Sequence, residues 1–236
     1  MWLAVKRMLY SVSATRFESG LGVSQHRIWS MRSVDHEMVD EGPGFTIARA
    51  HKAETLVPYF RAERPSGAIN HGWIDLRGRP ELVPEIPEAQ KSRGLANLLR
   101  VMAQQSSKVM SSACECGLFD RGEYADGPRW KADGFVTITF KDADKNADTE
   151  LLLYFARYIL GGIPTTEDHH IVFEMIIEPL KLFFGRTDCF ALSLKPIGYG
   201  ASEEVAWAAF NCAANSAAQA IQRGRAPDEQ IELYLT

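Results

Sequence analysis

The chain has 236 residues, with 26 Lys or Arg and 30 Asp or Glu, and a formal net charge of −4. Hydrophobic residues make up 46% and charged residues 24%, a globular composition that excludes a disordered or low-complexity chain. The charge is uneven, because residues 1–118 carry a net +3 and residues 119–236 a net −7. This length allows one large domain or two small ones, with a core that needs no disulfide.

Alternating apolar and polar residues predict a β-rich N-terminal region over residues 1–77. One strand is expected at 8–15, and another at 45–50 after the Gly-Pro-Gly turn signal of 42–44. Residues 69–76 are a further strand candidate.

A Pro-rich connection and a long helix are predicted for residues 78–118. Pro80, Pro84 and Pro87 exclude a continuous helix at the start of this region, which indicates an extended connection. Apolar residues then recur at helical spacing over 89–116, and Gly117 is a natural stop. The region is therefore a candidate boundary between two halves.

Residues 119–236 are predicted to form a ferredoxin-like βαββαβ unit, with its helices on one face of an antiparallel sheet. The expected elements are strands and helices in the order strand, helix, strand, strand, helix, strand: 134–141, 148–160, 169–178, 188–195, 202–222 and 230–235. The predicted class is α+β, and the three regions can pack as one domain.

The 202–222 helix is apolar on more than one side, which predicts burial on two sides. The second contact is expected inside the chain, with a homo-oligomer formed through this helix as the alternative. Its uncharged stretch approaches membrane length, but its Asn, Ser and Gln side chains are costly in lipid, so no membrane segment is expected. The glycines Gly198 and Gly200 before it indicate a turn, with Ser202 as the helix cap.

Four cysteines are too few to indicate a disulfide framework, and they favour a reducing, cytoplasmic location. Cys189 and Cys212 are expected to be small buried side chains. Cys114 and Cys116 are too close in sequence for a zinc knuckle. At the end of the predicted helix, the negative end of the dipole would raise their pKa and disfavour a nucleophilic role. The N-terminus is interrupted by charges and does not resemble a signal peptide.

One acidic turn has the ligand spacing of a calcium loop. Oxygen-bearing side chains occupy alternate positions: Asp142, Asp144, Asn146, Asp148 and Glu150. Ca²⁺ prefers six to eight such oxygens. The match then fails, because Ala147 stands where the loop needs Gly and Leu153 where it needs Glu. The alternative is a solvated turn that caps the following helix.

A second candidate site lies at the start of the 169–178 strand. Asp168, His170 and Glu174 would point to one side of a strand, where they could bind a transition metal or act as acid–base catalysts. His71 and Asp75 are further candidates that no motif places nearby. The alternative is that His170 marks the solvent-exposed start of a strand and that Glu174 pairs with a Lys.

The first functional hypothesis is a binding or protein-interaction protein, whose partner is a protein or a small ligand. The acidic half suits a basic partner, and Trp73 and Trp130 are candidate anchors. The alternative is an enzyme that uses the 168–174 cluster. A nucleic-acid-processing protein is least favoured, because the Arg residues of the first half are interleaved with Glu and no basic surface is indicated.

Overall fold

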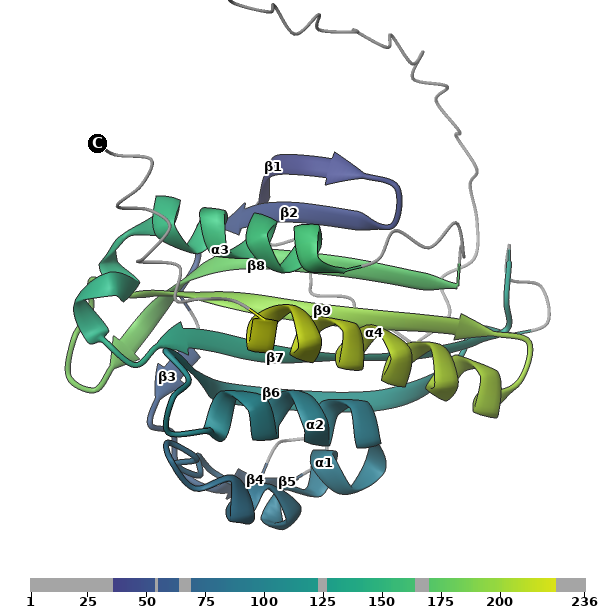
Figure 1. Cartoon of the computed structure of the whole chain (residues 1–236), viewed down its shortest axis with the longest axis horizontal. Helices are drawn as coiled ribbons and strands as arrows, with labels where there is room; N and C mark the ends of the chain where they lie inside the picture. The colour runs from purple at the N-terminus through teal and green to yellow at the C-terminus, as the bar shows by residue number, and fades with distance from the viewer. Residues whose placement is uncertain (1–35, 54, 64–68, 123–126, 164–169, 224–236) are drawn as a thin grey trace, which may run out of the picture. The chain divides into compact units, whose positions relative to one another are not determined.

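The computed structural model describes residues 36–53, 55–63, 69–122, 127–163 and 170–223 (Figure 1). The strands predicted at 8–15 and 230–235 lie outside these residues. The described chain is mixed α+β, as expected from the sequence.

Nine strands and six helical segments form the described structure. The strands are β1 (His36–Gly42), β2 (Phe45–Ala50), β3 (Thr55–Val57), β4 (Ala62–Glu63), β5 (Ile69–Asn70), β6 (Val109–Asp120), β7 (Trp130–Phe140), β8 (Ile171–Phe183) and β9 (Phe190–Gly200). The α-helices are α1 (Pro87–Lys91), α2 (Arg93–Ala103), α3 (Thr149–Gly162) and α4 (Glu203–Arg223), and the 3-10 helices are η1 (Pro80–Glu85) and η2 (Ala143–Ala147).

One sheet joins both halves of the chain in the order β1-β2-β8-β9-β7-β6, and β3 pairs with the far end of β8. The four long strands β6 to β9 are antiparallel, whereas β2 runs parallel to β8. In this order β6 lies at the edge of the sheet.

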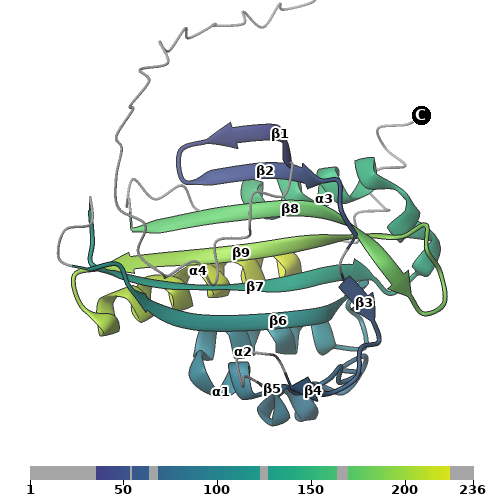
Figure 2. The same cartoon turned by 180° about the vertical axis from the view of Figure 1, so that it is seen from behind.

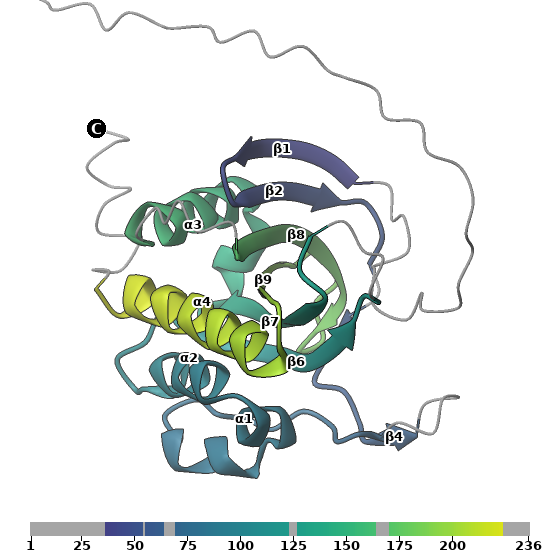
Figure 3. The same cartoon turned by 90° about the vertical axis from the view of Figure 1, so that its right-hand side faces the viewer.

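Helices α2, α3 and α4 cover one face of the sheet (Figures 1 and 3). Side chains of alternate residues on each strand point to this face, and Val136, Met175 and Leu194 are fully buried in its core. Figure 2 shows the opposite face, where the strands lie in front of the helices. That face carries polar side chains as well, including Thr137 and Lys195.

Helix α4 packs unusually close to β9. A Cβ atom at Gly198 would lie 2.2 Å from the backbone nitrogen of Phe210, and one at Gly200 would lie 2.4 Å from that of Ala206. The predicted turn at these glycines is therefore wrong: both residues belong to β9. They are glycines because any side chain would separate the helix from the strand.

The second side of α4 packs inside the chain, as predicted, because α2 lies against it (Figure 3). Polar side chains fix this contact. Asn211 of α4 accepts hydrogen bonds from the Ser92 hydroxyl at 2.8 Å and from the Gly94 backbone at 2.7 Å. Ser92 also caps α2 by accepting from the backbone of Leu95 at 3.0 Å. The start of α2 is thereby attached to the middle of α4.

The helix predicted over 89–116 is confirmed only in its first part, which forms α1 and α2, and is wrong beyond Ala103. Helix α2 ends at Ala103, and after a turn the chain continues as β6 from Val109, so Gly117 lies within a strand. The Pro-rich segment is also not extended, because it forms η1 and α1. The apolar residues from Val109 to Cys116 are compatible with a helix or a strand, and pairing with β7 makes this segment a strand.

The structure differs from the sequence prediction in two further regions. The described part of residues 1–77 is not clearly β-rich, since β3, β4 and β5 have only three, two and two residues. The ferredoxin-like unit is not confirmed: β7, α3, β8, β9 and α4 follow the predicted order, but the closing strand lies outside the described residues, and β6 pairs with β7 at the edge of the sheet. The strand at 45–50 and the helix capped by Asp148 are confirmed.

The α4–β9 contact gives a stability prediction. Gly198→Ala should lower the free energy of unfolding by about 1–3 kcal/mol, because the added methyl meets helix backbone that cannot rotate away. Chemical denaturation measures this change. The control is Gly161→Ala, where a Cβ meets nothing within 4 Å and stability should stay the same or rise slightly. Equal stability of the two variants would contradict the proposed close contact.

Candidate cavity at the edge of the sheet

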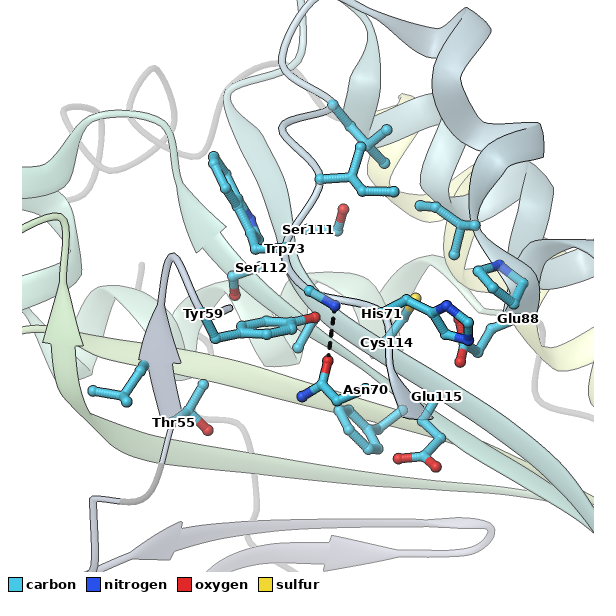
Figure 4. Close-up of a pocket in the computed structure, with 18 of the residues that line it drawn as sticks. Thr55, Tyr59, Asn70, His71, Trp73, Glu88, Ser111, Ser112, Cys114 and Glu115 are labelled. Atoms are coloured by element: carbon cyan, nitrogen blue, oxygen red, sulfur yellow. Dashed lines mark hydrogen bonds between the residues drawn. The ribbon is translucent and has the colours of Figure 1, made fainter. Parts of the chain in front are cut away.

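A cavity of about 410 Å³ lies beside β6 (Figure 4). Its walls come from three places: the chain between β3 and η1, the start of α1, and β6 with its neighbour β7. Three aromatic side chains, Tyr59, Trp73 and Phe135, supply much of the apolar lining. The cavity therefore brings together segments that are far apart in the sequence.

The cavity extends over the edge of β6 as well as over the face of the sheet that carries Phe135 of β7. Successive side chains of a strand point to opposite faces, so a cavity on one face would contact every second residue. Here all five residues from Ser111 to Glu115 line the cavity. Its wall therefore includes the backbone edge of the strand.

A β-bulge interrupts β6 inside the cavity. Ser111 pairs with Ile138 and Ala113 with Thr137, which leaves Ser112 as the extra residue. The Ser112 hydroxyl donates a hydrogen bond to the backbone oxygen of Thr137 at 3.1 Å. The bulge changes the direction of the edge at the point where the cavity opens.

The wall opposite β6 is the short loop after β5. Gly72, with φ of 87°, donates its backbone hydrogen to the Asn70 side chain at 3.0 Å, the bond drawn in Figure 4. Trp73 donates its backbone hydrogen to the carbonyl of Tyr59 at 2.9 Å. Its ring packs edge-on against Phe184, with centroids 5.3 Å apart. These contacts give the loop a fixed shape without pairing it to β6.

Helix α1 closes the cavity beyond the bulge. Pro87 and Glu88 line the cavity, and the Cys116 thiol lies 3.5 Å from the backbone oxygen of Glu88. Because α1 leads directly into α2, the attachment of α2 to α4 also positions this wall.

The lining carries negative charge. Glu88 and Glu115 line the cavity together with His71, and in the part of the chain that the structure describes no lining residue is Lys or Arg. Burial raises the pKa of the Cys114 thiol, and the nearby Glu88 carboxylate raises it further. Burial likewise raises the pKa of Cys116 to about 12. Both thiols are therefore protonated at neutral pH. Their location differs from the prediction, because Cys114 and Cys116 belong to a strand and not to the end of a helix.

The sequence-predicted 168–174 cluster is only partly described, because Asp168 lies outside the described residues. His170 precedes β8, and Glu174 forms an ion pair with Lys195 at 2.6 Å across β8 and β9. His170 and Glu174 are four residues apart along the chain, a separation of about 13 Å on an extended strand. The structure does not bring these two side chains together.

The other two candidates for that site lie elsewhere. His71 lines the cavity. Asp75 binds Arg77 through two hydrogen bonds of 2.9 and 2.7 Å, and this interaction lowers the pKa of its carboxyl group.

The oxygens of the acidic turn have partners within the chain. Asp142 and Asp148 accept backbone hydrogen bonds at the starts of η2 and α3, so the capping alternative is confirmed. Asn146 is buried and bonds both backbone groups of Phe140. The remaining two form ion pairs: Asp144 with Arg186 and Glu150 with Arg49. Within the described ranges no three His, Cys, Asp or Glu side chains are grouped to hold a metal, and calcium binding stays a prediction.

Some single-residue predictions can also be compared with the structure. Cys189 is buried as predicted, whereas Cys212 is exposed on α4. Of the two candidate anchors, Trp73 lines the cavity. Trp130 is partly buried at the start of β7, with the Arg129 guanidinium 5.4 Å from its ring centroid.

The cavity could not be predicted, because the pattern of apolar residues predicts a helix over 109–116. On a helix, Ser111 to Glu115 would point in different directions around the axis and could not form one wall. The spacing of Tyr59 and Phe135 also gives no sign that they meet.

Comparison with known proteins finds no match: no family model, no curated protein and no solved structure is similar to the chain. No helix in the part of the chain that the structure describes combines the length and hydropathy needed to cross a bilayer.

The cysteine environments predict a labelling order. At about pH 8, near the ordinary thiol pKa, iodoacetamide should alkylate exposed Cys212 first. Cys114 and Cys116 should stay unmodified in the folded protein, because raised pKa values keep the reactive thiolate scarce. Peptide mass spectrometry measures the order, with urea-unfolded protein as the control. Early modification of Cys114 would show that its thiol is activated.

Proposed function

We propose that this protein is a non-catalytic binding protein whose ligand occupies the cavity beside β6. The cavity itself supports this most directly, because about 410 Å³ falls in the range of roughly 300–1,000 Å³ that is typical of ligand sites. Its lining also has the usual composition of such sites, with aromatic walls and a few polar groups at fixed positions.

The chemistry of the lining favours binding over catalysis. The thiol of Cys114 has a raised pKa and is a poor nucleophile. The Ser112 hydroxyl donates to a backbone carbonyl of β7, so it is not paired with a base. The enzyme hypothesis would have to use Glu174, whose carboxylate is already paired with Lys195.

A cytoplasmic location belongs to the same proposal. Cys114, Cys116, Cys189 and Cys212 are all free thiols, which suits a reducing compartment.

The proposal predicts saturable binding of a neutral aromatic probe. Tryptophol carries an indole ring and one hydroxyl group, which match the aromatic and polar lining. Titration calorimetry should show binding to the wild-type protein. Ala113→Phe should weaken it by about tenfold or more, because the new ring fills space beside β6.

The matched control is Ala208→Phe, the same substitution at an exposed position of α4. It should leave the affinity for tryptophol unchanged, and thermal unfolding of both variants should show that each is folded. Equal affinity of the two variants, or no saturable binding to the wild type, would contradict the proposed site.

A further inference from the structure

The edge of β6 offers backbone hydrogen-bonding groups to the cavity. In an antiparallel pair, alternate residues of an edge strand direct their N–H and C=O groups away from the partner strand. Strand β6 has β7 as its partner, and no backbone hydrogen bond joins Ser111–Cys114 to any other described segment. The outward-facing groups of this stretch therefore point into the cavity.

The opposite wall leaves this edge open. The segment Asn70–Trp73 lines the cavity but forms no ladder with β6: Asn70 pairs with β4, Gly72 bonds the Asn70 side chain, and Trp73 bonds Tyr59. Between the loop and β6 there is a slot bounded by backbone on one side and by aromatic rings on the other. An added β-strand uses this combination: main-chain hydrogen bonds give affinity, and side pockets select alternate side chains.

The charge of the slot selects for a basic group. Among the described residues that line it, Glu88 and Glu115 are acidic and none is Lys or Arg, so a cationic side chain gains Coulomb energy beside Glu88 and an anionic one loses it.

Apolar side chains continue from the cavity to the surface. Leu56 and Ile69 line the cavity and are also exposed to solvent, at 39% and 48%. Phe60, next to the lining residue Tyr59, is 89% exposed. Large exposed apolar side chains around a cavity are typical of a surface that binds a macromolecule longer than the cavity.

We propose that the ligand is an extended segment of a partner protein, which pairs as an added strand with the edge of β6 and directs a Lys or Arg side chain towards Glu88 and Glu115. This inference rests on the proposed binding function and names the class of ligand. The apolar residues Leu56, Phe60 and Ile69 contact the partner on either side of the paired segment.

The probe is a capped pentapeptide, acetyl-Ser-Val-Lys-Val-Ser-amide, together with a series in which each backbone nitrogen is methylated in turn. Strand pairing uses alternate nitrogens, so methylation should weaken binding by about tenfold at alternate positions and have little effect between them. A uniform effect along the series, or none, would overturn the strand-addition mode.

A second comparison tests the charge. The same peptide with Glu in place of Lys should bind the wild-type protein at least about tenfold more weakly. Glu88→Gln should reduce the difference between the two peptides, whereas Glu85→Gln, at an exposed residue three positions earlier, should not. Equal binding of the Lys and Glu peptides to the folded wild type would overturn the charge preference.

Tryptophol separates this inference from the proposed function. If tryptophol binds and is lost in Ala113→Phe while no peptide binds, the cavity is a ligand site and the inference of an added strand is wrong. If neither tryptophol nor any peptide binds, both are wrong.

Discussion

The close contact between α4 and β9 is the interaction on which the rest of the structure depends. Gly198 and Gly200 let the helix backbone lie directly on the strand. From α4, the Asn211 side chain holds the start of α2, and α2 continues back into α1. Because α1 closes one end of the cavity, a contact in the core fixes the position of a wall at the sheet edge.

The cavity follows from the position of β6 at the edge of the sheet. Edge strands are usually short, charged or covered, since their free backbone groups can pair with other chains. Strand β6 has 12 residues, and its middle part borders the cavity and pairs with no described segment other than β7. The bulge at Ser112, the aromatic rings and the carboxylates that line the cavity are the features that support the proposed binding function.

The sequence predicted those elements whose signals are local. Strand β2 alternates clearly after a glycine turn, and α3 begins at the capping residue Asp148. The sequence prediction was wrong at β6, because the apolar residues there are compatible with a helix or a strand. Only pairing with β7, which is distant in the sequence, decides between the two. The prediction was also wrong at Gly198, where the need for glycine comes from a helix that packs from outside the strand. The cavity could not be predicted without the correct assignment of β6.

Hydrogen exchange of single backbone amides measures the central claim most directly, since it reports whether the edge of β6 is open. In the free protein, the amides of Ser111–Cys114 that face away from β7 should exchange much faster than those of β7 and β9, which are paired on both sides. Slow exchange at every position of this stretch, as slow as in the central strands, would show that the edge is already paired and would contradict the account.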